Sequence, residues 1–172
     1  SCKSAACGAG TYGTATDATT APTCTNCVAG RYSGATGLTS SDQCNKCPLG
    51  TWLNTAGARS RNTCINCVVG KYGDTDGATS ISACKDCIAG VEFQDAAGQP
   101  SCKSAACGAG TYGTATDAAT APTCTNCVAG RYSGATGLTS SDQCNKCPIG
   151  RYSTTPGLID AGTCINCPVG KK

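Results

Sequence analysis

The stretch CTNCVAGRYSGATG occupies residues 24–37 and recurs unchanged at residues 124–137. It is one instance of a pattern that returns every 20 residues. The second cysteine of each pair marks this period, at Cys7, Cys27, Cys47, Cys67, Cys87, Cys107, Cys127, Cys147 and Cys167. A short fixed period is typical of repeat proteins, in which each repeat contacts mainly its neighbours. The sequence therefore predicts a tandem array of small units rather than one globular domain.

Two further positions keep register with the cysteines. A glycine stands three residues after each second cysteine, as at Gly30, and in seven of the nine repeats an aromatic residue follows two positions later, as at Tyr32. In the fifth repeat the aromatic residue moves by one position, to Phe93. Because glycine takes a positive φ angle at little cost, this glycine predicts a turn. The extended stretch through the aromatic residue and a second turn after it predict a short β-hairpin in each repeat.

A longer period lies over the short one. Residues 1–48 and 101–148 differ only at Thr19 and Ala119, so five repeats form a superrepeat of 100 residues. Residues 1–100 are one superrepeat and residues 101–172 a second, incomplete one, and we expect the chain to be an excerpt of a longer array. The predicted fold class is small disulfide-rich repeats, stacked as an elongated rod of 20-residue units with short β-hairpins and little or no helix.

The composition agrees with a covalently stapled protein. The chain has 18 cysteines in 172 residues but only 1 Trp, 6 Tyr and 1 Phe. This cysteine content is typical of a disulfide scaffold, which replaces a conventional hydrophobic core with covalent links. Disulfides persist in oxidising compartments, so we expect an extracellular or cell-surface location.

The same composition argues against several classes of protein. The net charge of +3, with 13% charged residues, lacks the basic clusters of a nucleic-acid-binding protein. No apolar run approaches the roughly 18 residues of a membrane span, so none is expected in this segment. Histidine is absent and acidic residues are few, so we expect no catalytic residues, no cofactor and no enzyme activity.

One disulfide in each 20-residue unit fits both periods. Linking equivalent cysteines, such as Cys24 with Cys44, would give a 40-residue period that does not divide 100. A bond within one C-x-x-C pair would be strained and easily reduced. Closure from the second cysteine of one pair to the first of the next is worth roughly 3 kcal/mol per loop and places the aromatic residue where it can pack on the sulfur bridge. The expected pairs are Cys7 with Cys24, Cys27 with Cys44, Cys47 with Cys64, Cys67 with Cys84, Cys87 with Cys102, Cys107 with Cys124, Cys127 with Cys144, and Cys147 with Cys164; Cys2 and Cys167 are left over.

Metal binding is the main alternative for the cysteines. The spacing C-x2-C-x16-C-x2-C is also that of a zinc ribbon. However, nine pairs follow one another without spacer domains, so one pair would always be left over, and no metal site is expected. The stretch GDTDG at residues 73–77 places two carboxylates near a turn, as calcium loops do, but it lacks the later glutamate ligand, and a simple turn is favoured.

Polar residues predict two surface features. Cations precede the aromatic position at Arg31, Lys71, Arg131 and Arg151, where we expect a solvated edge, with stacking on a neighbouring ring as the alternative. The loop between Cys7 and Cys24 is rich in Thr, Ala and Pro, which favours O-linked glycans. The candidate positions are Thr14, Thr16, Thr19, Thr20 and Thr23.

The stretch CTNCVAGRYSGATGLTSSDQCNKCPLGTW, residues 24–52, resembles the ephrin-receptor-like, or GCC2/GCC3, cysteine-rich repeats through their signature C-x-x-C-x-x-G-x-Y. The resemblance implies disulfide-bonded repeats that are distantly related to the cysteine modules of tumour-necrosis-factor receptors. Long runs of these units occur in surface proteins of protists, such as mastigoneme proteins and ciliate immobilisation antigens, so the resemblance extends to these proteins. The chain departs from the signature at the wider spacing of Cys2 and Cys7 and of Cys102 and Cys107, and at Glu92.

The hypothesis that follows is a structural, extracellular repeat glycoprotein. It would form a filament, a mastigoneme-like flagellar appendage or a cell-surface coat, through self-association or with other structural glycoproteins. The alternative is the stalk or ligand-binding ectodomain of a surface receptor or surface antigen. The near-identity of the superrepeats favours the structural role, because the modules of receptors diverge to form distinct ligand sites.

Overall fold

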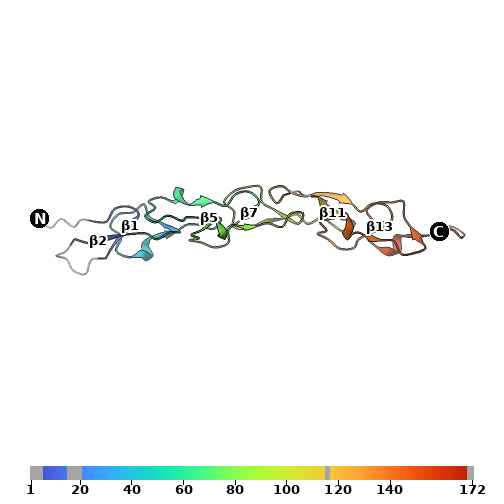
Figure 1. The fold of residues 1–172 in the computed structure, drawn as a ribbon, viewed down its shortest axis with the longest axis horizontal. Coiled ribbons are helices and arrows are strands. Elements are labelled where there is room, and N and C mark those ends of the chain that lie inside the picture. The colour runs from blue at the N-terminus through green and yellow to red at the C-terminus, as the bar shows by residue number, and fades with distance from the viewer. Residues whose placement is uncertain (1–5, 15–20, 115–116, 170–172) are drawn as a thin grey trace. The chain divides into compact units, whose positions relative to one another are not determined.

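The structure is a computed structural model and describes residues 6–14, 21–114 and 117–169 (Figure 1). The chain folds into two compact units. The first contains the described residues up to Lys85 together with Ala96–Ser101, and the second contains Asp86–Asp95 and the described residues from Cys102 onward. The division therefore falls in the irregular fifth repeat, whose loop between Cys87 and Cys102 contributes residues to both units.

Each repeat contributes one short antiparallel hairpin. Its first strand begins directly after the turn glycine, and its second strand lies at the next cysteine pair. In the second repeat β3 (Arg31–Tyr32) pairs with β4 (Asn45–Lys46), with Tyr32 opposite Asn45. The prediction of small disulfide-rich repeats with short hairpins is confirmed.

The remaining hairpins follow the same plan. Those whose first strand lies in the first unit are β1 (Thr11–Thr14) with β2 (Thr23–Asn26), β5 (Thr51–Trp52) with β6 (Ile65–Asn66), and β7 (Lys71–Tyr72) with β8 (Lys85–Asp86). Those of the second unit are β9 (Glu92–Phe93) with β10 (Lys103–Ser104), β11 (Thr111–Thr114) with β12 (Thr123–Asn126), β13 (Arg131–Tyr132) with β14 (Asn145–Lys146), and β15 (Arg151–Tyr152) with β16 (Ile165–Asn166).

The helical structure of the described residues consists of single 3-10 turns, each ending at the first cysteine of a pair. They are η1 (Ser41–Gln43), η2 (Arg61–Thr63), η3 (Ile81–Ala83), η4 (Ser141–Gln143) and η5 (Ala161–Thr163). A serine or aspartate caps each turn, because its side-chain oxygen accepts an otherwise unpaired backbone N–H. In η1 the Gln43 side chain also accepts the amides of Thr39 at 2.7 Å and Ser40 at 3.2 Å, which completes a capping box.

Disulfides form most of the interior. In the described part of the chain, the buried apolar residues other than cysteine are Leu53, Ala58, Ala78 and Leu138. Tyr32 packs against Cys47, Leu53 and Ala58. Tyr32 itself lies within the loop closed by Cys27 and Cys44. The disulfide that it contacts, Cys47–Cys64, is therefore that of the following loop and not its own. The cause is a parallel bridge between Tyr32 and Ala58, which folds the next loop back over the ring.

Backbone hydrogen bonds join each repeat to the next. The amide of Gly10 donates to the carbonyl of Ser33 at 2.8 Å, and the amide of Cys27 donates back to the carbonyl of Gly10 at 2.8 Å. The amide of Ser33 donates in turn to the carbonyl of Ala58 at 3.0 Å. Because these contacts use main-chain atoms, the repeats can differ in side chains and still stack.

The turn glycine is required by its conformation and, in some repeats, by a close contact. Gly30 has a φ of +78°, which confirms the predicted turn. A Cβ atom at Gly30 would lie 2.1 Å from the carbonyl oxygen of Gly77, two repeats further on. Gly37 has a φ of +73°, but a Cβ atom there would meet only the Cβ atom of Ala6, at an ordinary distance of 3.6 Å.

These two glycines provide a matched test of the contact between repeats. Both Gly30→Ala and Gly37→Ala place a side chain in the left-handed region, at a cost of about 1–2 kcal/mol. Only Gly30→Ala must also push Gly77 away, so it should destabilise its surroundings more. Hydrogen exchange measures this at the amide of Cys47, which donates to the carbonyl of Gly30 at 2.8 Å, and at the amide of position 37, which donates to the carbonyl of Cys7 at 2.7 Å. Equal losses of protection in the two variants would contradict the contact.

Candidate functional site

The structure joins sixteen cysteines in eight disulfides, each from the second cysteine of one pair to the first of the next. This is the register that the spacing predicts. Seven of the loops have a sequence separation of 17 and the fifth has 15, with Cα–Cα distances of 5.5–5.9 Å. The pairs are Cys7–Cys24, Cys27–Cys44, Cys47–Cys64, Cys67–Cys84, Cys87–Cys102, Cys107–Cys124, Cys127–Cys144 and Cys147–Cys164. Cys167 is unpaired and half-buried, and Cys2 lies outside the described residues.

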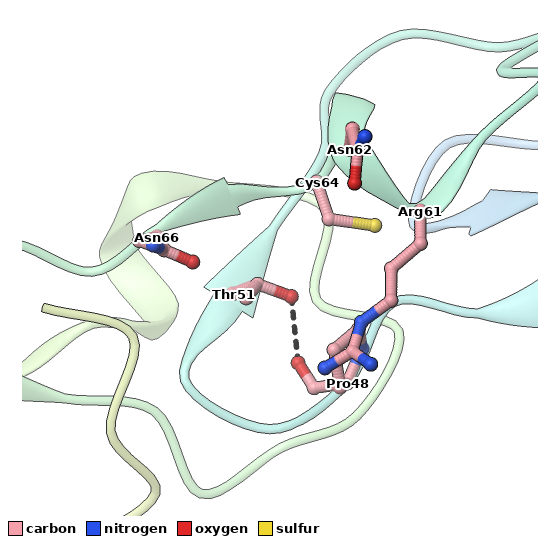
Figure 2. Close-up of a pocket in the computed structure, with 6 residues that line it drawn as sticks. All are labelled: Pro48, Thr51, Arg61, Asn62, Cys64 and Asn66. Atoms are coloured by element: carbon pink, nitrogen blue, oxygen red, sulfur yellow. Dashed lines mark hydrogen bonds between the residues drawn. The ribbon is translucent and has the colours of Figure 1, made fainter.

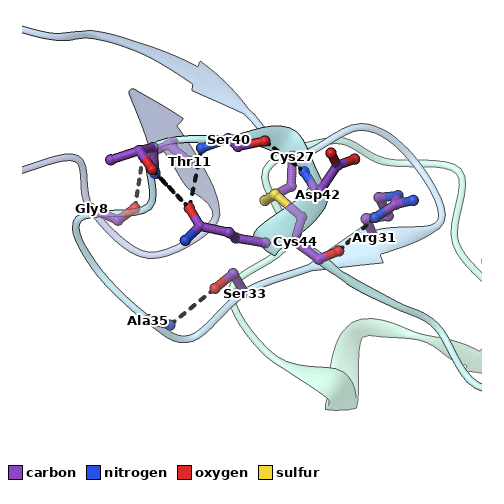
Figure 3. Close-up of a disulfide and its surroundings, with 11 residues drawn as sticks. Gly8, Thr11, Cys27, Arg31, Ser33, Ala35, Ser40, Asp42 and Cys44 are labelled. Atoms are coloured by element: carbon purple, nitrogen blue, oxygen red, sulfur yellow. Dashed lines mark hydrogen bonds between the residues drawn. A yellow bond between two sulfur atoms is a disulfide. The ribbon is translucent and has the colours of Figure 1, made fainter. Parts of the chain in front are cut away.

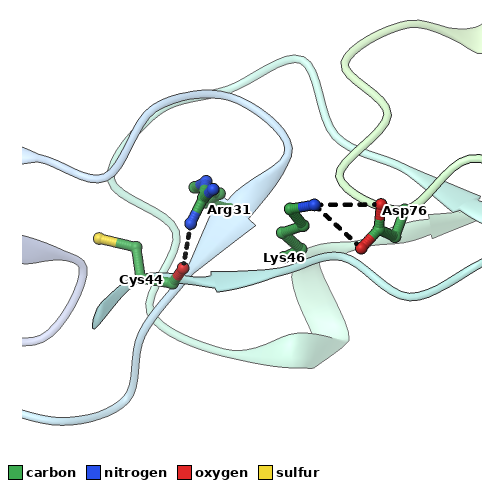
Figure 4. Close-up of polar contacts among 4 residues, drawn as sticks. All are labelled: Arg31, Cys44, Lys46 and Asp76. Atoms are coloured by element: carbon green, nitrogen blue, oxygen red, sulfur yellow. Dashed lines mark hydrogen bonds and ion pairs between the residues drawn. The ribbon is translucent and has the colours of Figure 1, made fainter. Parts of the chain in front are cut away.

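The disulfide between Cys27 and Cys44 shows how the chain protects a bridge (Figure 3). Cys27 and Cys44 are 0% and 1% exposed. Arg31, which precedes the aromatic position on β3, donates from Nη1 to the carbonyl oxygen of Cys44 at 2.8 Å (Figures 3 and 4). Arg131 makes the same bond to Cys144 at 2.7 Å. At these two positions the expected solvated edge is wrong, because the guanidinium ties the first strand to the end of its own loop.

Two of the disulfides have an exposed cysteine. Cys24 and Cys124 lie exposed on β2 and β12, whereas Cys44 and Cys144 are both 1% exposed. Cys44 and Cys144 directly follow a 3-10 turn. The hairpins at Cys24 and Cys124 are instead four residues long on each strand. The first loop of each superrepeat is thus the less protected one.

The acidic stretch at residues 73–77 forms ion pairs. Asp74 accepts from Lys85 Nζ at 2.7 Å, and Asp76 accepts from Lys46 Nζ at 3.1 Å (Figure 4 shows the second pair). The hydrogen bond from Lys85 lowers the pKa of Asp74 below its ordinary value, which favours the ionised carboxylate. Both carboxylates therefore pair with lysines on exposed surface, where such pairs contribute little to stability. No group of three or more His, Cys, Asp or Glu residues is placed to hold a metal within residues 6–14, 21–114 and 117–169.

The third loop carries a shallow pocket of about 270 Å³ (Figure 2). Its lining consists of Pro48, Thr51, Arg61, Asn62, Cys64 and Asn66. The turn η2 presents Arg61 and Asn62, and the hairpin of β5 and β6 presents Thr51 and Asn66. This site was not predicted from the sequence. The available signal was Arg61, because the first residue of the corresponding turn is Ser41, Ile81, Ser141 or Ala161 elsewhere.

The structure describes two of the five candidate glycosylation positions. Thr23 lies exposed on β2, and Thr14 ends β1. Thr16, Thr19 and Thr20 lie outside the described residues. The described helical turns are too short and too polar to cross a membrane.

Disulfide mapping of the third and eighth loops tests the pairing. These loops differ in sequence, whereas peptides from the second and seventh loops cannot be told apart by mass. Digestion without reduction should link Cys47 to Cys64 and Cys147 to Cys164, and metal analysis should find no zinc. A link between Cys44 and Cys64, or about one zinc ion for every two cysteine pairs, would contradict this arrangement.

Residues 38–84 match the family model described as tyrosine-protein kinase ephrin type A/B receptor-like. A comparison with curated proteins gave no match. The matched segment contains the complete Cys47–Cys64 and Cys67–Cys84 loops. The other loops have the same closure, from second cysteine to first cysteine, and the same hairpin after the turn glycine. Residues 38–84 therefore fit the ephrin-receptor-like family, and the remaining loops repeat the same disulfide closure and hairpin.

Proposed function

We propose that the chain is a structural element of an extracellular assembly: a filament, a mastigoneme-like flagellar appendage or a cell-surface coat. The observation that carries the proposal is the way in which the repeats are joined. Backbone hydrogen bonds link each repeat to the next, and each loop has its own disulfide. Because no shared core limits the number of repeats, further repeats can be added by the same contacts.

Contacts that skip one repeat support a load-bearing role. Gly10 lies against the carbonyl of Gly57, and Gly110 lies against the carbonyl of Gly157, in each case two repeats further on. The repeats that contain Gly10 and Gly110 thus contact both the next repeat and the one after it, and bending there would have to break both sets of contacts. The eight disulfides and the family point to the outside or the surface of a cell, where thiols are oxidised.

The second candidate is a stalk or a ligand-binding ectodomain of a surface receptor or antigen. One observation favours it: the superrepeats diverge in their second half, so that Thr51, Arg61 and Asn62 correspond to Arg151, Ala161 and Gly162. Electron microscopy of native material, labelled with an antibody against residues 24–37, separates the two. Label spaced regularly along filaments or across a coat supports the structural role, and label on isolated molecules at a membrane supports the stalk.

The elongated shape is a prediction that scattering can test. The repeats bury few large side chains, so contacts between distant repeats have little to stabilise them. The radius of gyration of the chain should therefore exceed about 15–16 Å, the value expected for a compact body of this length. Reduction of the disulfides should remove the ordered structure as a whole, because the buried apolar residues are mainly cysteines. A compact scattering profile, or order that survives complete reduction, would count against the proposal.

O-linked glycans on the first loop of each superrepeat are the second part of the proposal. After reduction, trypsin should release residues 4–31, which contain Thr14, Thr16, Thr19, Thr20 and Thr23. We expect this peptide from native material to carry one or more hexose or hexosamine masses. Residues 62–71 supply the control, because Thr63 donates its hydroxyl hydrogen to the Ser60 carbonyl at 2.6 Å. Recovery of residues 4–31 from native material only at the mass of the bare peptide would refute glycosylation here.

A further inference from the structure

The pocket of the third loop is a feature that a purely structural role does not use. It lies within the first unit and is lined by one basic residue, three neutral polar residues, a proline and a disulfide-bonded cysteine. No acidic residue lines it. Such a lining favours an anionic ligand that also carries neutral hydrogen-bonding groups.

The polar groups of the pocket are available for a ligand. Within the described residues the guanidinium of Arg61 makes no ion pair and no hydrogen bond, and the side-chain amides of Asn62 and Asn66 have no hydrogen-bond partner. The Thr51 hydroxyl donates to the carbonyl of Pro48 at 2.6 Å, which leaves its oxygen free to accept (Figure 2). The pocket therefore offers a ligand one guanidinium group, two carboxamides and one hydroxyl oxygen that can accept a hydrogen bond.

The framework around these groups is held in place. Cys64 is bonded to Cys47, which is completely buried. Asn66 lies against Gly98, where a Cβ atom would come within 2.8 Å of the carboxamide oxygen. The cap of η2, in which Ser60 accepts the amide of Asn62 at 3.2 Å, fixes the turn that presents Arg61. Because this backbone is already fixed, binding of a ligand has to order only the side chains themselves.

We propose that this pocket binds a single carboxylate-bearing sugar unit, such as a uronic acid of an acidic glycan. The planar guanidinium of Arg61 matches a carboxylate through two parallel hydrogen bonds. The carboxamides of Asn62 and Asn66 both donate and accept, which suits sugar hydroxyls. The volume of about 270 Å³ lies just below the range of pockets for drug-sized ligands, so one sugar unit fits better than a longer segment.

The chain contains its own comparison sites. At the positions of Arg61 and Asn62, the second loop has Ser41 and Asp42, the fourth has Ile81 and Ser82, and the eighth has Ala161 and Gly162. None of these loops places an arginine on the turn, and Asp42 would repel a carboxylate. Sugar binding should therefore be confined to the third loop. The acidic glycan could belong to a neighbouring chain or to a free polysaccharide, and the inference does not depend on filament formation.

Titration of the isotope-labelled full chain with methyl α-D-glucuronide tests the inference by nuclear magnetic resonance. We expect saturable shifts at the side-chain amides of Asn62 and Asn66 and at the backbone amide of Thr51, with a Kd of about 1–10 mM, as expected for one small polar ligand. Arg61→Gln should weaken binding at least tenfold. Arg59→Gln removes the same charge two residues away, outside the pocket lining, and should leave the Kd unchanged.

Two further probes identify the ligand class. Methyl α-D-glucoside lacks the carboxylate and should bind at least tenfold more weakly than the glucuronide. N-acetylaspartate carries carboxylates without sugar hydroxyls. A lower Kd for it than for the glucuronide would show that the pocket recognises acidic peptides and would overturn the inference. Equal effects of Arg59→Gln and Arg61→Gln, or the absence of shifts at 50 mM glucuronide, would also overturn it. Unchanged spectra of the second and fourth loops, which flank the third loop in the first unit, serve to show that each variant remains folded.

Discussion

The disulfide that closes each loop is the interaction on which the rest of the structure depends. In the described part of the chain most buried apolar residues are cysteines, so the sulfur bridges take the place that leucine and phenylalanine hold in ordinary domains. Closing a loop of this size limits the unfolded chain and is worth roughly 3 kcal/mol. The hairpin, the turn glycine and the 3-10 turn each lie within a few residues of a cysteine, and their geometry follows from the closure.

Neighbouring loops are not independent of one another. Tyr32 and Tyr112 each pack on the disulfide-bonded cysteines of the following loop. The same rings form parallel bridges to residues of that loop, Tyr32 to Ala58 and Tyr112 to Leu138. An aromatic residue therefore shields the bridge beyond its own. Loss of one disulfide should expose the ring of the preceding repeat as well as its own loop.

Much of the fold could be predicted because its determinants are strictly periodic. The second cysteine and the turn glycine recur every 20 residues, so the loops, their register and their hairpins follow from spacing and from the conformational freedom of glycine. The 3-10 turns were missed, although Ser40 and Gln43 carry the capping-box pattern. The bond from Arg31 to Cys44 and the pocket around Arg61 could not be predicted, because they depend on how side chains cross between loops. Periodicity describes what the repeats share, whereas these sites arise from what differs among them.

The direction of the disulfides has a consequence for how such a chain can change in length. Each bridge begins at the second cysteine of one pair and ends at the first cysteine of the next, within a single period. Removal or duplication of a block of 20 residues, or of the 100-residue superrepeat, leaves every remaining cysteine with a partner at the same separation. Recombination between the nearly identical segments 1–48 and 101–148 would insert or delete whole superrepeats and would keep the cysteine spacing at the junction unchanged. The number of repeats can thus change without any change in how the cysteines pair.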